Sequence, residues 1–347
     1  NVSTESIVDG MRAKNFPTTT INWYSYYLRH RTMVTEHQDI SIEKRLTRGT
    51  PQGGVLSPLM WNLAFESLLE QYQQGEVKIC GFADDAALIM VGKNPAILEA
   101  RMQAAINKAL SWGRTRTLEF SAAKTQCILF TWKRKFTQPR PLTINGTEVP
   151  YSKEVKYLGI TLDSKLTFSS HIKKKIRAAK GHLLNLQNAM GRLWGTTPKM
   201  TRWLYTSVVR PALTYGAVVW AKGVQTQTTE KQLDRVNRLA LVTMGHFRRG
   251  TPTAGLEVIT NIWPLPLYIK YAAVSGYNRI HNLCESQPDQ LPRAWRYEVV
   301  QSPVPGLRVT QQTHHLDYCR CLLETVGHRV LPSDRLSNHF QWKKWYE

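Results

Sequence analysis

The sequence has 347 residues, enough for two or three domains with substantial hydrophobic cores. Its 46 Lys and Arg against 25 Asp and Glu give a formal charge of +21, which favours a polyanionic partner. No apolar run approaches the roughly 20 residues that span a bilayer, and the five scattered cysteines form no disulfide framework. These features exclude a membrane-spanning protein and a disulfide-stapled secreted domain, and they favour an intracellular protein that does not act at a membrane.

Two helices and two strands are predicted ahead of the first glycine-rich segment. Residues 3–13 place apolar side chains at helical spacing behind a capping Ser3 or Thr4. A second helix is expected after Pro17, with these side chains directed inward: Ile21, Tyr24, Tyr27 and Leu28. We interpret the aromatic residues of this helix as core packing, with stacking on nucleic-acid bases as the alternative. Residues 32–35 and 40–42 are predicted to form paired strands.

A glycine-rich loop follows at residues 48–58, which read RGTPQGGVLSP. Three glycines and two prolines give a backbone that can approach a ligand closely. The loop carries Arg48, a cation suited to phosphate, and Gln52, whose side chain both donates and accepts hydrogen bonds. An apolar helix is predicted from about Val55 to Tyr72. Taken alone the glycines are a weak signal, because ordinary turns and helix starts also use them.

Two adjacent acids, Asp84 and Asp85, lie between the short apolar runs of residues 78–91. This pattern predicts a strand, a tight turn and a second strand. Two neighbouring carboxylates repel each other, and a divalent cation is the usual way to offset that repulsion. Their hard oxygen ligands point to magnesium. The alternative is an ordinary exposed polar turn.

Residues 95–163 are predicted to alternate between a helix and short strands. Apolar side chains at near-fourfold spacing indicate a helix over residues 95–115, and a helix, loop and strand pattern follows over residues 118–130. Residues 142–149 form an alternating hairpin with an Asn-Gly turn. A further strand region, residues 155–163, contains Gly159, which would let nucleic acid or another backbone come close.

The basic charge gathers in the C-terminal part of the chain. Residues 1–91 carry 8 basic and 10 acidic side chains, whereas residues 92–347 carry 38 and 15. Residues 165–222 hold 11 basic side chains and no acidic one, in helices predicted to break near residues 195–198 and at Pro211. One helix concentrates five of these cations: Lys173, Lys174, Lys175, Arg177 and Lys180. A solvated face usually mixes signs, so this helix is predicted to lie along a phosphate backbone.

The last hundred residues give weaker signals. Helical patterns continue to about Met244, and another segment starts after residues 250–253. From Cys284 onward proline and polar residues increase, which indicates a linker or partly ordered region. Five residues there could be interpreted as a metal cluster: His314, His315, Cys319, Cys321 and His328. The Cys-x-Cys spacing is unlike the usual zinc clip, so zinc is the disfavoured interpretation.

The order of these motifs resembles a reverse transcriptase, an RNA-directed DNA polymerase. RGTPQGGVLSP at residues 48–58 resembles the template- and nucleotide-positioning motif, and FADD at residues 82–85 resembles the metal-binding motif. YLGI at residues 157–160 resembles the primer grip, and residues 157–220 resemble the thumb of non-LTR retrotransposon enzymes of the jockey and I-element group. The resemblance covers about residues 1–280.

The resemblance implies an α+β fold with a polymerase palm, in which an antiparallel sheet packs with helices. Residues 1–163 would be a partial palm with the primer-grip strand, residues 164–245 a basic helical thumb, and residues 246–347 a connection region. It also implies an RNA template, a DNA primer and dNTPs as partners, and further domains of the same polyprotein, an endonuclease and an RNase H. The parent element would act in the nucleus or the cytoplasm.

The resemblance also implies a reaction and the residues that perform it. Nucleotidyl transfer would use two Mg²⁺ ions, or Mn²⁺ in their place. The metal ligands would be Asp84 and Asp85, and Lys124 would donate a proton or neutralise charge, unless it is a solvated loop lysine. Nucleotide and template would be bound by Arg48, Gly49, Gln52, Gly53 and Phe82. The primer would be held by Tyr157, Leu158 and Gly159, and the nucleic-acid backbone by the five cations of residues 173–180.

One element of this family's metal site is not found in the sequence. The family's third acid ends an earlier strand, and Asn1 resembles the residues just after that strand. The acids before the glycine loop do not lie in an apolar strand: Glu5, Asp9, Glu36, Asp39 and Glu43. The sequence is therefore expected to be an N-terminally truncated polymerase that is inactive by itself. The alternative is a catalytically dead retroelement remnant that only binds nucleic acid.

Overall fold

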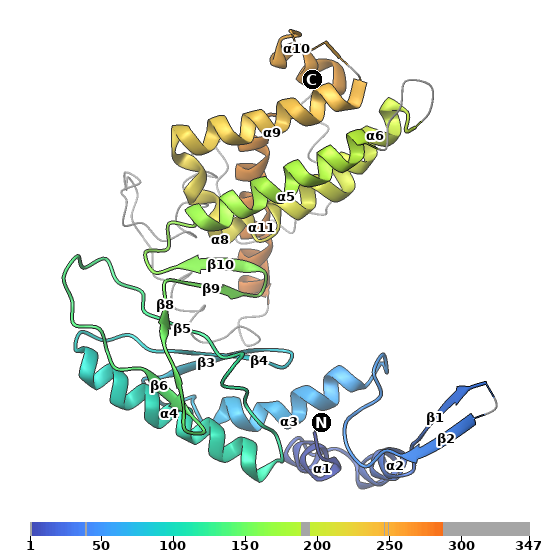
Figure 1. Cartoon of the computed structure of the whole chain (residues 1–347). Coiled ribbons are helices and arrows are strands. Elements are labelled where there is room, and N and C mark those ends of the chain that lie inside the picture. The colour runs from blue at the N-terminus through green and yellow to red at the C-terminus, as the bar shows by residue number, and fades with distance from the viewer. Residues whose placement is uncertain (1, 39, 189–194, 246, 249, 287–347) are drawn as a thin grey trace. The chain divides into compact units, whose positions relative to one another are not determined.

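The computed structural model describes residues 2–38, 40–188, 195–245, 247–248 and 250–286, and it shows the expected mixture of helices and short strands (Figure 1). The chain separates into two compact units, Asn1–Val155 and Lys156–Glu347. The polar C-terminal segment and the five His and Cys residues of the disfavoured zinc cluster lie outside the described residues. Every described helix is too short or too polar to cross a bilayer.

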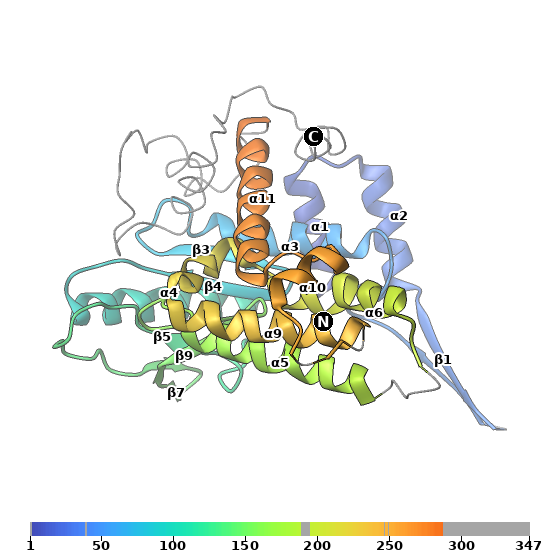
Figure 2. The same cartoon turned by 90° about the horizontal axis from the view of Figure 1, so that it is seen from above.

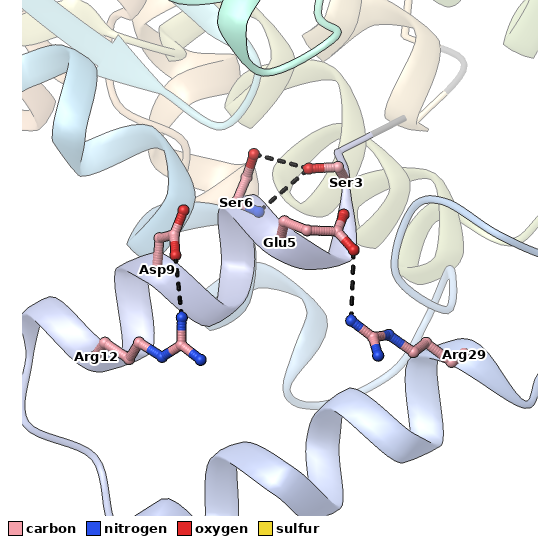
Figure 3. A network of polar contacts seen from close by, with 6 residues as sticks. All are labelled: Ser3, Glu5, Ser6, Asp9, Arg12 and Arg29. Carbon is pink, nitrogen blue, oxygen red and sulfur yellow. Dashed lines mark hydrogen bonds and ion pairs between the residues drawn. The ribbon is translucent and has the colours of Figure 1, made fainter.

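The first unit begins with two packed helices, α1 (Thr4–Ala13) and α2 (Thr18–Arg29). The Ser3 hydroxyl caps α1 by accepting a hydrogen bond from the Ser6 amide at 3.1 Å, as the sequence predicts. Glu5 pairs with Arg29 across the two helices, with 3.5 Å between Oε1 and Nη2 (Figure 3). These contacts fix the N-terminal end of α1, which lies next to the glycine loop.

One inward-facing residue of α2 was predicted wrongly. Ile21, Tyr24 and Leu28 are buried as expected, but Tyr27 is 43% exposed. Trp23 stacks on Tyr27 outside the core, with ring centroids 6.1 Å apart. Residues 21, 24 and 28 follow one stripe of the helix that packs inward, and position 27 lies beside that stripe.

A hairpin, β1 (Thr32–His37) and β2 (Ile40–Arg45), follows α2 and extends away from it (Figure 1). The rest of the unit contains α3 (Ser57–Glu70), β3 (Lys78–Phe82), β4 (Asp85–Ile89) and α4 (Pro95–Thr115). Among the described residues the strands pair two by two and form no larger sheet. Four further strands complete this unit: β5 (Cys127–Ile128), β6 (Leu142–Ile144), β7 (Thr147–Val149) and β8 (Tyr151–Ser152).

The helical unit follows a short hairpin, β9 (Glu154–Tyr157) and β10 (Ile160–Asp163). Long helix α9 lies alongside α5 in both views (Figures 1 and 2). The elements in order are α5 (Ser169–Asn188), α6 (Pro198–Leu204), the π-helical turn η1 (Tyr205–Val209), α7 (Arg210–Thr214), α8 (Ala217–Trp220), the 3₁₀ turn η2 (Ala221–Gln225), α9 (Gln227–Gly245), α10 (Thr253–Thr260) and α11 (Leu265–Ser286).

Two details of this unit differ from the sequence prediction. Pro211 does not break the helix, because it lies in the first turn of α7, where a missing N–H is tolerated. The chain bends instead at Gly216, whose φ is 66°. Residues 155–163 are two strands joined by a turn rather than one strand, and Leu158 and Gly159 form that turn.

A buried histidine joins the β9–β10 hairpin to the helices. His171, only 2% exposed, accepts a hydrogen bond on Nδ1 from the Thr161 amide at 3.1 Å and packs against the ring of Trp220. Its Nε2 is buried and has no hydrogen-bond partner among the described residues. Burial, and then the charges of Lys175 and Lys174, lower the pKa of His171 to about 4. The imidazole is therefore neutral at pH 7, and its protonation opposes folding.

We predict that acid weakens this unit through His171. Between pH 6.5, its ordinary pKa, and about 4, the unfolded chain binds the proton and the folded chain does not, so stability falls as pH is lowered through this window. The loss is at most roughly 1.4 kcal/mol per pH unit, and stability from this group is complete above about pH 7. Urea unfolding midpoints at pH 7.5 and 5.0 measure it.

His171→Asn is the matched variant, because its amide oxygen can still accept from Thr161 but does not titrate. It should lower stability at both pH values through lost packing, and it should show a smaller difference between them. An equal pH dependence in both proteins would contradict the assignment to His171.

Candidate functional site

The two acids lie at the tip of the β3–β4 hairpin. Phe82 pairs with Asp85 across the antiparallel strands, so Ala83 and Asp84 form the two-residue turn. Both carboxylates and the Phe82 ring are exposed. Ala83 has φ 52°, a left-handed conformation that is unfavourable for a residue with a Cβ atom. Such strain persists only where the surroundings hold the backbone in place.

Helix α3 holds this turn through two aromatic residues. Trp61 donates a hydrogen bond from Nε1 to the Ala83 carbonyl oxygen at 2.6 Å. One turn further along, the buried Phe65 lies against Gly81, where an added Cβ would be 2.4 Å from Cε1 of the ring. Phe65 in turn stacks on Trp61 and meets the edge of Trp112 on α4. The position of the acids therefore depends on α3.

The same helix also holds the glycine loop. The Ser57 hydroxyl, at the start of α3, donates to the Pro51 carbonyl oxygen at 2.6 Å. Ser57, Trp61 and Phe65 are four residues apart, so they lie on one side of α3. The glycine loop and the acid turn are thus attached to successive turns of one helix. The structure brings these two sequence motifs together.

The start of the glycine loop is held by residues near the N-terminus and by Arg31. The Gly49 amide donates to the Val2 carbonyl oxygen at 2.8 Å, and Ser3 and Arg48 form an antiparallel bridge. Arg31, between α2 and β1, donates from Nη2 to the Gly49 carbonyl oxygen at 2.5 Å. Arg48, Gln52 and Gly53 remain exposed. The side chains of Arg48 and Gln52 are therefore available to a ligand.

The described residues do not supply a complete metal site. No group of three or more His, Cys, Asp or Glu residues within them is arranged to hold a metal ion. Asp84 and Asp85 provide the hard oxygen donors that Mg²⁺ prefers, but only from one hairpin. Asp9 pairs with Arg12 on α1 at 3.6 Å (Figure 3), while Glu36 and Glu43 lie on the β1–β2 hairpin. Asp39 lies outside the described part.

Lys124 lies in an exposed turn between residues 121 and 125, where Thr125 bonds back to the Ser121 carbonyl oxygen. The hydrogen bonds and ion pairs of the described residues do not join Lys124 to either acid. In the second unit, Tyr157 ends β9, and Leu158 and Gly159 form the turn to β10. The catalytic role of Lys124 and the primer role of residues 157–159 stay predictions.

The cations of α5 divide between two faces. Lys173 and Arg177 are exposed and Lys180 is half-buried, and their spacing places all three on one stripe. Lys175 instead donates from Nζ to the Ala212 carbonyl oxygen at 3.0 Å. Lys174 is also exposed but lies roughly 100° around the helix from Lys173, outside that stripe. The stripe that can follow a phosphate backbone is therefore Lys173, Arg177 and Lys180.

Sequence reasoning missed the residues that hold the two motifs, namely Arg31, Ser57, Trp61 and Phe65. Their only signal is the spacing of residues 57, 61 and 65 immediately after the glycine loop. Patterns of this kind are shared by most buried helices.

The chain is similar to reverse transcriptases and to proteins of retrotransposable elements. Residues 1–162 match the family described as reverse transcriptase (RNA-dependent DNA polymerase). The chain is 26% identical over 252 residues to a putative 115 kDa protein in the type-1 retrotransposable element R1DM of Drosophila melanogaster, covering 73% of this chain and 24% of that protein.

Two further relatives carry similar names. A retrovirus-related Pol polyprotein from element R1 of Nasonia vitripennis is 25% identical over 305 residues, covering 86% of this chain and 89% of that protein. An RNA-directed DNA polymerase from the mobile element jockey of Drosophila melanogaster is 26% identical over 188 residues, covering 51% and 20%. The chain spans about a quarter of the length of the R1 proteins of Drosophila melanogaster and Bradysia coprophila.

The close approach of Gly81 to Phe65 gives a prediction about the acid turn. Gly81→Ala should lower the free energy of unfolding by about 1–3 kcal/mol, because the added methyl must displace a packed ring. Urea unfolding measures this loss. Gly75→Ala is the control, since its added Cβ would meet its nearest atom at an ordinary 3.7 Å. Equal stability of the two variants would contradict the packing of Phe65 under the turn.

Proposed function

We propose that the chain, whose residues 1–162 match the reverse transcriptase (RNA-dependent DNA polymerase) family, is the polymerase portion of a non-LTR retrotransposon protein. Its reaction is template-directed nucleotidyl transfer, which extends a DNA primer with dNTPs along an RNA template. The single observation that carries this proposal is the attachment of the glycine loop and the acid turn to successive turns of α3. A polymerase needs a nucleotide-binding loop and a metal-binding turn side by side.

Different residues of the first unit are proposed to bind metal, to neutralise charge and to position the nucleotide. Asp84 and Asp85 are proposed to hold Mg²⁺, and Lys124 to neutralise charge or donate a proton at the leaving pyrophosphate. When bound, two magnesium ions lower the pKa of the primer 3′-hydroxyl and stabilise the leaving oxygens. Arg48 and Gln52 are proposed to position the nucleotide and template, because they are exposed on a loop whose backbone is fixed at Gly49 and Pro51.

The second unit is proposed to hold nucleic acid. The Leu158–Gly159 turn with Tyr157 would grip the primer end, as in the family that the motif resembles. The stripe Lys173, Arg177 and Lys180 would follow the sugar–phosphate backbone, because like charges spaced along one helix match the regular charge of a strand. In these terms residues 1–163 act as part of a palm that includes the primer grip, and residues 164–245 act as a thumb.

A second candidate function is nucleic-acid binding without polymerisation by these residues alone. The observation that favours it is the acid set, since the described residues offer two adjacent carboxylates and no group of three metal donors. Two metal ions held about 4 Å apart need bridging carboxylates from more than one strand. Primer extension separates the two candidates.

The proposal also covers the domains that act with this chain and its place in the cell. The longer relatives are named as polyproteins or as proteins of mobile elements, and the chain covers only part of them. We propose that further domains, an endonuclease and an RNase H, act with it, and that it works inside the cell, in the nucleus or the cytoplasm. The high basic charge supports a nucleic-acid partner.

Asp84→Asn should abolish Mg²⁺-dependent primer extension on an RNA template and leave binding of the primer–template duplex nearly unchanged. The carboxylate is proposed to hold metal, whereas the cations of α5 hold the duplex. Extension is measured for this chain and for the chain joined to the upstream segment of the Drosophila melanogaster R1 relative.

The control for this variant is Glu148→Gln, which removes an exposed carboxylate from β7 and should change neither property. Equal loss of extension and binding in Asp84→Asn would contradict the metal-ligand role. Absence of extension in both forms of the unsubstituted protein would favour the binding-only candidate.

Neutralising Lys173, Arg177 and Lys180 together, each to Gln, should weaken duplex binding and reduce the slope of log K against log salt by about 3 units. This follows if each cation contacts one phosphate. Binding is measured by fluorescence anisotropy at several salt concentrations.

Lys231→Gln with Arg235→Gln is the control on α9, where the acids Glu230 and Asp234 alternate with these two cations along the sequence. Its slope should stay close to that of the unsubstituted chain. An unchanged slope in the α5 variant would contradict the thumb assignment.

A further inference from the structure

The turn between β9 and β10 has a backbone shape that its own residues do not favour. Leu158 has φ 45° and Gly159 has φ 81°, so both central residues are left-handed. Hairpin turns of this type prefer Asn-Gly, because Asn tolerates the left-handed region and a bulky residue does not. A leucine there is strained, and the surroundings must offset that strain.

The partner that meets this turn is Tyr215, 57 residues further along the chain. Its hydroxyl donates a hydrogen bond to the Leu158 carbonyl oxygen at 3.2 Å. Its ring lies so close to Gly159 that an added Cβ would be 3.1 Å from Cε1. Tyr215 therefore contacts both residues of the turn, one through its hydroxyl and the other through its ring.

Tyr215 also contacts Lys175 of α5, which bonds in turn to α7. The ammonium of Lys175 lies 5.3 Å from the centroid of the Tyr215 ring and donates to the Ala212 carbonyl oxygen. Burial, and then the nearby Lys156, lower the pKa of Lys175 below its ordinary value. A lysine in such a place is a packing element, which explains why Lys175 turns away from the exposed stripe of α5.

The chain path around Tyr215 is also fitted to the hairpin. Gly216 follows it with φ 66°, and a Cβ there would be 2.7 Å from Cδ1 of Ile160 on β10. The junction between α7 and α8 therefore seats directly against the first residue of β10. Tyr215 nevertheless remains 54% exposed, so burial of its ring does not explain its contacts.

We propose that Tyr215 is a positioning residue: it holds the Leu158–Gly159 turn in its left-handed shape and thereby sets the place of the primer end. This inference rests on the proposed function, because it takes the turn to be the primer grip. The net contribution of one hydrogen bond is similar in size to the cost of a left-handed leucine. Removing the hydroxyl should release the turn without unfolding the helices around it.

Displacement of the primer end by as little as 1 Å can slow a templated reaction about 100-fold, because the reacting atoms must meet at near-contact distance. The duplex itself is proposed to be held by the stripe Lys173, Arg177 and Lys180, whereas the α5 cation beside Tyr215 is Lys175. Loss of the Tyr215 hydroxyl is therefore expected to change the geometry and reactivity of the primer end more than the affinity for the duplex.

The test compares Tyr215→Phe with the unsubstituted chain. Hydrogen exchange of the amides in residues 157–160 should become about 2- to 10-fold faster, and the urea midpoint should stay nearly the same. A primer with 2-aminopurine at its 3′ end reports the local environment of that base. Its fluorescence in the bound duplex should change while the duplex Kd stays within about twofold. Tyr26→Phe, on the exposed face of α2, is the control and should change none of these.

Leu158→Asn supplies a rescue. Asn-Gly adopts the required turn by itself, so in this background Tyr215→Phe should have much less effect on exchange and on the 2-aminopurine signal. Unchanged exchange in Tyr215→Phe, or an equal effect in both backgrounds, would overturn the proposal. So would a loss of global stability that accounts for every change.

Failure of the proposed function gives a different pattern. If no form of the protein binds the duplex or extends the primer, the primer role falls, and the exchange data alone decide whether Tyr215 holds the turn. If the duplex binds and the primer is extended, but Tyr215→Phe leaves the 2-aminopurine signal and the rate at saturating primer unchanged, the positioning role is wrong and the polymerase assignment stands.

Discussion

The arrangement of the first unit depends on one side of helix α3. Ser57, Trp61 and Phe65 contact, in order, the glycine loop, the acid turn and the strand that leads to that turn. Because four residues of a helix advance roughly 6 Å, the helix fixes the separation of the two motifs more rigidly than the loops could. A nucleotide bound at the loop would therefore find the carboxylates at a constant place. The rigidity comes from the buried face of α3, whose Leu68 is fully enclosed.

The local structure of this chain could be predicted from its sequence, because short-range patterns determine it. The helix over residues 95–115 has the predicted bounds, and the Asn145–Gly146 turn joins β6 and β7 as expected. Tyr27 and Pro211 show the limit. The exposure of Tyr27 depends on how much of α2 its neighbouring elements cover. The effect of Pro211 depends on whether it falls in the first turn of a helix or in the interior of one. The residues next to Tyr27 and Pro211 in the sequence determine neither outcome.

The candidate site shows the same division. The acids, the glycine loop and the basic helix could be found from residue type and order, since each is a local cluster of chemically distinctive groups. The residues that hold them could not. Trp61 bonds to a carbonyl 22 residues away, and Arg31 to one 18 residues away. Helical spacing puts Lys175 roughly 200° around α5 from Lys173, and there it donates to the carbonyl of Ala212. Which of these two sides packs against other helices could not be predicted from the sequence.

The β3–β4 turn and the β9–β10 turn both combine a strained backbone with a hydrogen bond from an aromatic side chain. Ala83 and Leu158 each begin a two-residue turn in a left-handed conformation that their side chains disfavour. In each turn an aromatic side chain bonds to the carbonyl oxygen of that strained residue: Trp61 to Ala83 and Tyr215 to Leu158. The Asn145–Gly146 turn uses residues that adopt the same conformation readily. Both turns for which a role in chemistry is proposed therefore have a strained residue that a side chain from another segment contacts. In each turn, substitution of the aromatic residue that bonds to the strained residue is therefore expected to alter the backbone shape.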